Sequence, residues 1–80
     1  MLEEALEHLV KGIVEHPDDV RVRARRIRTG RVLEVRVHPD DLGKVIGRGG
    51  RTAKALRTVL NALSNGKYVR IDLVDLEEAR

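Results

Sequence analysis

Apolar residues recur along the chain with two different periods, and these periods divide it into helices and strands. Over residues 2–14 they follow a helical period, with charged residues mostly off the apolar stripe. We expect this helix to end before Pro17, because the residue ahead of a proline is driven toward an extended conformation. Over residues 20–37 apolar and polar residues alternate in two runs around a turn at 29–30, which predicts an antiparallel hairpin. The alternation slips at 26–27, which predicts a bulge or a bend in the first strand.

Helical periodicity returns over residues 39–64, where a glycine-rich turn at 47–50 separates a short helix from a long one. Alternation over residues 69–73 predicts a third strand. A strand–helix–helix–strand connection favours parallel pairing of the second and third strands, with the strand at 32–37 in the centre. The predicted fold class is α+β, in the order α-β-β-α-α-β. It has two layers, a three-stranded mixed sheet with the helices on one face, and it forms a single domain over residues 1–80.

The tetrapeptide His-Pro-Asp-Asp occurs twice, at 16–19 and at 38–41. The flanking residues do not match, so we interpret it as chance reuse of a proline-containing connector and not as an internal repeat. We expect Asp40 and Asp41 to lie at the start of a short helix, where negative charge complements the helix dipole.

The composition narrows the classes of protein that the chain can belong to. Its 80 residues provide one aliphatic core, with no Phe, no Trp and a single Tyr. The chain has no Cys, which excludes disulfides and thiolate metal sites. Its start is acidic and amphipathic, unlike a signal peptide, and no apolar run approaches the roughly 18 residues of a membrane span. We therefore expect a cytoplasmic protein.

The basic residues are concentrated in the middle of the chain. Residues 21–57 carry a net charge of +9, whereas the remainder carries −6. Such a separation favours a basic face that meets a polyanion. The alternative is a solvated surface crossed by salt bridges, and the charge pattern by itself does not separate the two interpretations.

The densest candidate for a binding site is a glycine-rich turn with arginine in it and after it, Val45-Ile46-Gly47-Arg48-Gly49-Gly50-Arg51. Glycine lets backbone approach a ligand closely, and the start of the following helix turns its N–H groups toward the loop. A nucleotide-hydrolysing P-loop would need glycine where Arg48 stands, and a dinucleotide-binding turn would need glycine where Thr52 stands. The pattern that remains is Gly-x-x-Gly between two helices, which indicates a site for backbone phosphate.

This segment resembles the signature of the KH domain, over Val45-Ile46-Gly47-Arg48-Gly49-Gly50-Arg51-Thr52-Ala53-Lys54-Ala55-Leu56. The order of elements resembles the type II, prokaryotic KH arrangement, and the resemblance covers nearly the whole chain. Within the family, the chain is similar to small bacterial RNA-binding proteins that consist of a single KH domain. The resemblance therefore implies a two-layer type II KH fold.

The resemblance implies that single-stranded RNA lies across a groove, with about four nucleotides held and the turn clamping the backbone. Arg48 would contact phosphate, the N–H groups of Gly49 and Gly50 would be candidate donors, and Gly47 would complete the clamp. Ile46 and Ala53 would help to line the groove. Many KH domains carry a larger aliphatic residue at the position of Ala53, so base selectivity is left open by this departure.

Residues beside the turn extend the candidate site. We predict that at least two of the residues Lys44, Arg51 and Lys54 contact phosphate, with solvated helix charge as the alternative. Arg36 is a candidate for the rim of the groove. Tyr68 is better explained as a packing residue at the end of a strand than as a platform for a base.

The sequence favours a binding protein over an enzyme. No Ser/His/Asp set or paired carboxylates are arranged for catalysis, and we expect no catalytic residue and no cofactor. His8, His16 and His38 lack the spacing of metal ligands, so we expect no metal site.

We therefore expect a non-catalytic protein that clamps single-stranded RNA, as an RNA chaperone or a post-transcriptional regulator. A protein-interaction module on a KH scaffold and a single-stranded DNA binder are the alternatives. Because aromatic stacking adds ~1–3 kcal/mol per base and this chain has one aromatic residue, we expect modest affinity for the isolated protein. The resemblance further implies a homodimer, or a heterodimer with a second KH-containing bacterial protein, which would raise avidity.

Overall fold

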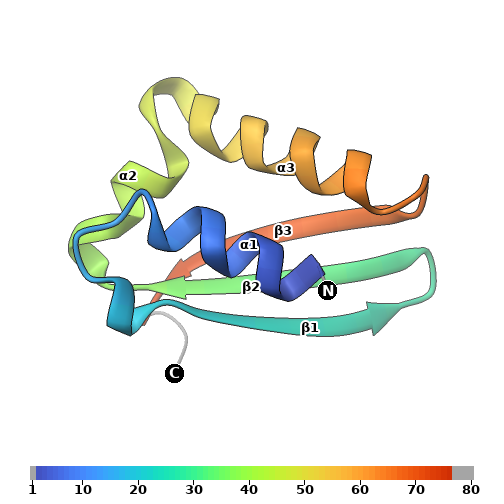
Figure 1. Cartoon of the computed structure of the whole chain (residues 1–80), viewed down its shortest axis with the longest axis horizontal. Helices are drawn as coiled ribbons and strands as arrows, with labels where there is room; N and C mark the ends of the chain where they lie inside the picture. The colour runs from blue at the N-terminus through green and yellow to red at the C-terminus, as the bar shows by residue number, and fades with distance from the viewer. Residues whose placement is uncertain (1, 77–80) are drawn as a thin grey trace.

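A computed structural model describes residues 2–76 of the chain (Figure 1). The elements in chain order, with η denoting 3₁₀ turns, are α1 (Leu2–Lys11), η1 (Pro17–Asp19), β1 (Arg21–Ile27), β2 (Gly30–Val37), η2 (Pro39–Asp41), α2 (Leu42–Ile46), η3 (Arg48–Gly50), α3 (Arg51–Leu63) and β3 (Tyr68–Asp75). Among the described residues, no helix is both long enough and apolar enough to cross a membrane.

The three strands form one mixed sheet in the order β1-β2-β3. β1 pairs antiparallel with β2 through the hairpin, and β3 returns parallel to β2 after the helical connection. The predicted central position of the second strand and its parallel pairing with the third are confirmed. The α+β class, with the two-layer type II KH arrangement, is confirmed with them.

The core lies between the sheet and the helices α1 and α3, which cover one face (Figure 1). Alternate residues of β2 and β3 point into it, and Leu6 and Val10 of α1 meet Leu56 and Leu60 of α3 above them. Burying aliphatic side chains of this size stabilises a fold by ~1.5–3 kcal/mol each, which is how a chain with one aromatic residue builds a core. The buried members are Leu6, Val10, Val20, Leu33, Val35, Val37, Val45, Leu56, Leu60, Val69 and Ile71. We call the face of the sheet turned away from the helices the open face.

The ends of two elements differ from the sequence prediction. α1 ends at Lys11 and not at residue 14, because Gly12 is a weak helix former and Ile13 N–H turns back to the carbonyl of Val10 at 2.9 Å. The third strand is longer than residues 69–73, because β3 pairs with β2 along its full length.

Of the two alternatives predicted at residues 26–27, a bulge or a bend, the bulge is wrong. Pairing continues without a break, with Arg26 opposite Arg31 and Ile27 opposite Gly30. The apolar alternation slips there because the strand end extends past the helices, so Arg26 stays exposed on the helix side of the sheet. β1 is an outer strand, and most of its side chains are exposed.

Candidate nucleic-acid interface

The glycine turn joins α2 to α3 through three positive φ angles. These are 79° at Gly47, 63° at Gly49 and 78° at Gly50, a region that residues other than glycine rarely adopt. A Cβ on Gly47 would lie 2.7 Å from both Cβ and N of Thr52, so no side chain fits at this position. The other two glycines face open space. Backbone at this corner is therefore bare and accessible.

Backbone donors at the turn are only partly available. Gly50 N–H donates to the carbonyl of Gly47 at 3.1 Å in this conformation, so its donation to a ligand would require exchange of that bond and stays a prediction. Within residues 2–76, Gly49 N–H makes no hydrogen bond. Gly49 is therefore the candidate donor of the two, and Arg51 N–H bonds to the carbonyl of Arg48 as α3 begins.

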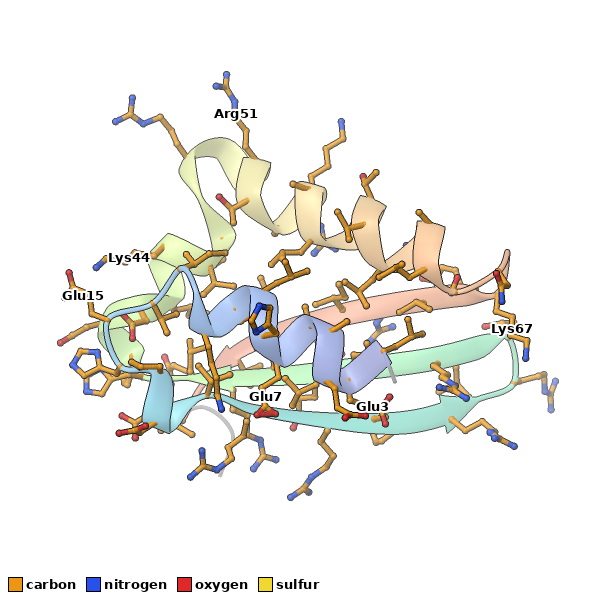
Figure 2. The ribbon with its side chains drawn as sticks, in the orientation of Figure 1. Glu3, Glu7, Glu15, Lys44, Arg51 and Lys67 are labelled. Atoms are coloured by element: carbon orange, nitrogen blue, oxygen red, sulfur yellow. The ribbon has the colours of Figure 1, made fainter. Side chains whose placement is uncertain are left out.

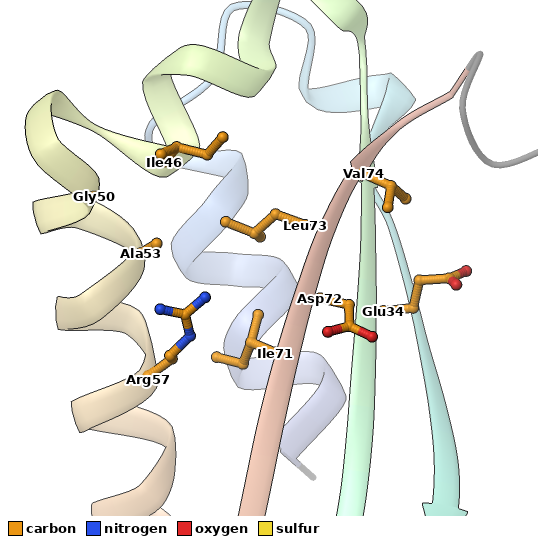
Figure 3. A pocket seen from close by; sticks show the side chains of 9 residues that line it. All are labelled: Glu34, Ile46, Gly50, Ala53, Arg57, Ile71, Asp72, Leu73 and Val74. Carbon is orange, nitrogen blue, oxygen red and sulfur yellow. The ribbon is translucent and has the colours of Figure 1, made fainter.

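A groove of about 470 Å³ runs from this turn between α3 and β3 (Figure 3). Ile46, Gly50, Ala53 and Arg57 form its helical side. The other side is formed by Ile71, Asp72, Leu73 and Val74 of β3, with Glu34 of β2 beyond them. The structure thus brings three of the predicted site residues, Ile46, Gly50 and Ala53, to one wall. Val45 is fully buried beneath them.

The strand wall of the groove is an unpaired sheet edge. Asn61 of α3 satisfies the outward backbone groups of Val69: its Oδ1 accepts from Val69 N–H at 3.2 Å and its Nδ2 donates to the carbonyl at 3.3 Å. Outward groups recur at every second residue of a strand, so Ile71 and Leu73 present theirs to the groove. The sequence did not indicate that Asn61, a polar residue within a helix, pairs with the backbone of a strand.

The predicted phosphate contacts fall into two groups. Arg48, Arg51 and Lys54, which we call the turn cations, are exposed, and Arg51 points away from the sheet (Figure 2). Lys44 instead forms an ion pair with Glu15, Nζ to Oε1 at 2.6 Å, and this partner lowers the pKa of the Glu15 carboxyl.

Arg36 and Arg57 stand in different relations to the groove. Arg36 donates from Nε to Glu34 at 2.8 Å, and Glu34 lines the groove while Arg36 does not. The place of Arg36 at the rim of the groove stays a prediction. Arg57, which the sequence did not single out, does line the groove and points inward (Figure 3). The sequence could have predicted this position, because Arg57 follows Ala53 by one helical turn and lies on the same face of the helix.

Carboxylates on the far wall limit where an anion can bind. Asp72 accepts two hydrogen bonds from Arg70, both at 3.0 Å, and this bond raises the pKa of the Arg70 guanidinium. Glu34 lies opposite Asp72 across the strand pair. Phosphate is therefore favoured on the turn side of the groove, whereas the acidic side suits hydrogen-bond donors such as the amino groups of bases.

The two His-Pro-Asp-Asp segments meet at the base of α2, which the sequence gave no reason to expect. The rings of His16 and His38 stack with centroids 4.0 Å apart. Asp41 is 1% exposed and accepts from the N–H groups of Glu15 and His16, at 3.1 and 2.9 Å, and from Nδ1 of His16 at 2.9 Å. Asp41 therefore lies at the start of a helix and also links the two segments. We call these contacts of Asp41, together with the stacked rings of His16 and His38, the joint. Among the described residues, no group of three or more His, Cys, Asp or Glu side chains is arranged to hold a metal ion.

Tyr68 is the first residue of β3 and is 51% exposed on the open face, and its role as a packing residue at the end of a strand stays a prediction. It does not line the groove.

Comparison with known proteins gives a consistent family. A family model described as KhpA/KhpB, KH domain, matches residues 3–74. The chain is 72% identical over 80 residues to the RNA-binding protein KhpA of Streptomyces coelicolor, covering 100% of both chains. It is 67% identical over 75 residues to the RNA-binding protein KhpA of Leifsonia xyli subsp. xyli, covering 94% of this chain and 99% of the relative. The corresponding protein of Mycobacterium tuberculosis is 60% identical over 75 residues, covering 94% of this chain and 92% of the relative.

Proposed function

The chain belongs to the KhpA/KhpB family of KH domains, as its sequence resemblance predicted, and on that basis we propose that it binds single-stranded RNA without catalysis. The observation that carries the proposal is the bare glycine turn, with a free donor at Gly49 and the turn cations beside it, at the mouth of a groove of about 470 Å³. The names of the relatives support RNA as the ligand.

In the proposed mechanism the RNA backbone crosses the turn and the bases enter the groove. Arg48 contacts one phosphate, Gly49 N–H donates to a phosphate oxygen, and Arg51 and Lys54 attract the next ones. Ile46 and Ala53 form the apolar wall against which bases lie. The outward N–H groups of Ile71 and Leu73 donate to base edges, and their outward carbonyls, with the carboxylates of Asp72 and Glu34 behind them, accept from base edges.

The proposed cellular role is that of a cytoplasmic RNA chaperone or post-transcriptional regulator. No aromatic side chain lines the groove, so stacking adds nothing to the affinity of the groove itself. We therefore place the protein in a homodimer or in a heterodimer with a second KH-containing bacterial protein, where two modest sites act on one RNA.

The test compares RNA binding by the wild type and by an Arg48→Asp, Gly49→Asp double variant across a salt series. Aspartate tolerates the left-handed backbone of Gly49 better than most residues, so the variant keeps the turn. Each phosphate neutralised on a single strand contributes about −0.7 to the log–log salt slope. We expect two to four contacts' worth of slope, about −1.4 to −2.8, in the wild type, and near abolition of binding in the variant.

The matched control is Lys11→Asp, Gly12→Asp, which replaces another cation–glycine pair with the same change in net charge. It should bind RNA like the wild type. Equal binding by the turn variant and the wild type would remove the clamp. A folded wild type that binds no RNA would favour the protein-interaction alternative, and a preference for DNA of the same sequence would favour the single-stranded DNA alternative.

A further inference from the structure

A second group of basic side chains lies at the tip of the hairpin. Arg26 and Arg31 face each other across β1 and β2, Arg28 lies in the turn between the strands, and Lys67 precedes β3. We call these four residues the hairpin-end cluster. Together with Ile27 and Gly30 they line a hollow of about 270 Å³, and no acidic side chain is among its lining residues.

The charge of this cluster is offset only in part, because one carboxylate, that of Glu3, lies beside two of its members. None of the ion pairs that the structure shows among residues 2–76 involves its four members. By contrast Lys44, Arg36 and Arg70 elsewhere on the molecule each have a carboxylate partner. Glu3 lines a neighbouring hollow with Arg26 and Arg31, but Arg28 and Lys67 extend beyond it. Cations kept close together without partners cost free energy through repulsion, which an anionic ligand would relieve.

The cluster is separate from the glycine turn. α3 runs from the turn toward the loop that carries Lys67, and a helix of its 13 residues is about 20 Å long. Arg51 and Lys67 accordingly lie toward opposite ends of the molecule (Figure 2). A ligand held in the groove by about four nucleotides therefore leaves the hairpin end unoccupied.

The exposed aromatic residue of the chain is at this same end, on the open face, whereas Arg26 and Arg31 lie on the helix side, so a bound strand would pass around the end of the sheet. Tyr68 follows Lys67 directly and pairs with Gly30, which lines the hollow. Ile27, Gly30 and Tyr68 form one row across the sheet, and the row has no side chain at its centre. Tyr68 is 51% exposed on the open face, so part of its surface is accessible to a ligand.

We propose that the hairpin end is a second RNA-binding site, with phosphate in the basic hollow and a base stacked on Tyr68. The proposal rests on the proposed function in taking RNA as the ligand, but it does not use the glycine turn. Cations that follow the backbone combined with an aromatic platform are what single-stranded nucleic-acid sites are built from. Three of the four cations are arginines, whose planar fork matches phosphate. One chain would then hold a strand longer than its groove, or two strands at once.

An acidic protein partner is the competing occupant. A carboxylate surface would use the same cations, but it would give no role to an exposed tyrosine beside them. The two occupants therefore differ in what a change at Tyr68 does to RNA binding.

The test uses Arg28→Glu, Lys67→Glu, two exposed positions outside regular structure, and the matched control Lys11→Glu, Arg21→Glu, with the same change in net charge. Both are measured with a strand of about four nucleotides and with one of about 16, the upper end of what one single-strand module covers. We expect the wild type to bind the longer strand more tightly and with a steeper salt slope. The hairpin variant should lose about 1.4 of that slope, two phosphates' worth, and should bind the short strand like the control.

A second pair of variants keeps the test independent of charge. Tyr68→Phe should retain binding of the longer strand, whereas Tyr68→Leu, which lacks a π-face, should lose at least about fivefold. Equal losses in the hairpin variant and in its control would overturn the proposal, because net charge would then explain them. Retention of long-strand binding in both the hairpin variant and Tyr68→Leu would overturn it in favour of a protein partner. A wild type that binds short RNA and gains nothing from length overturns this site alone, whereas one that binds no RNA overturns the proposed function as well.

Discussion

Single residues at the glycine turn carry different requirements, although the sequence presents them as one motif. Gly47 is glycine because Thr52 occupies the space of a side chain, and its φ of 79° adds to the restriction. Gly49 has a positive φ but open space around its Cα. The first requirement concerns folding, whereas the second leaves the surface free for a ligand.

Alanine substitutions should separate these two requirements. Gly49→Ala introduces strain from positive φ alone and should cost about 1 kcal/mol of unfolding free energy. Gly47→Ala adds a collision with the backbone and side chain of Thr52, and should cost about 2–4 kcal/mol. Urea unfolding of the two variants, followed by circular dichroism, measures the difference. Equal losses would show that φ, and not the contact with Thr52, makes Gly47 necessary.

The sequence predicted the role of a single residue only where that role depends on residues nearby in the chain. Glycine and arginine in the turn were recognisable because their roles need only their neighbours. Asp41 was missed because its main partners, Glu15 and His16, are 26 and 25 residues away in the chain, respectively. Asn61 was missed for a related reason, since its amide is paired with a strand that begins after the helix ends.

Helices and strands followed from apolar periodicity, and their order fixed the sheet topology, because a right-handed crossover leaves few alternatives. Apolar periodicity misplaced the end of α1 at Gly12, the pairing at the exposed end of β1, and both ends of β3. The contacts between the connecting segments were predicted less well than the helices and strands themselves. The turns η1 and η2 are joined through Asp41 and the stacked rings of His16 and His38, and this joint holds the start of α2 against the end of α1.

Protonation of Asp41 should weaken this joint. Burial raises the pKa of the Asp41 carboxyl, but the hydrogen bonds from Glu15 and His16 lower it by more, so it lies below its ordinary value of 3.8. A carboxyl with a lowered folded-state pKa stabilises the protein above pH 3.8, and this stabilisation is lost as the pH falls through the folded pKa. Asp41→Asn should therefore lower the urea midpoint at pH 7, and the difference from wild type should narrow in acid.

The control for this joint is Asp40→Asn, the exposed neighbouring residue with the same change in charge. It should leave the urea midpoint near that of the wild type at both pH values. A constant gap between Asp41→Asn and the wild type across the pH series would mean that shape, and not the carboxylate charge, holds the connection.

For the whole molecule, the basic character of residues 21–57 is divided between cations that are free and cations that are paired. Lys44 lies next to the glycine turn, yet Glu15, from the connection after α1, holds it at 2.6 Å. The exposed ion pair contributes little stability. Its larger effect is to hold one cation away from the proposed path of the RNA.

Release of Lys44 should strengthen RNA binding. Glu15→Gln removes the partner, so we expect affinity to rise about two- to fivefold and the salt slope to steepen by about 0.7, one further phosphate. Glu7→Gln, which frees Lys11 on the far side of α1 and changes the net charge equally, is the control and should leave both quantities nearly unchanged. Equal gains in the two variants would assign the effect to net charge alone. The measurement is a fluorescence anisotropy titration at several salt concentrations.

The arginines of β1 also bear on how the protein behaves when it is concentrated. An outer strand offers its backbone to any other strand, and pairing of such edges starts fibres and precipitates. Four of the seven residues of β1 are arginines, so two copies brought edge to edge would place like charges side by side along the whole contact. This edge is thereby protected against polymerisation while the sheet itself remains open.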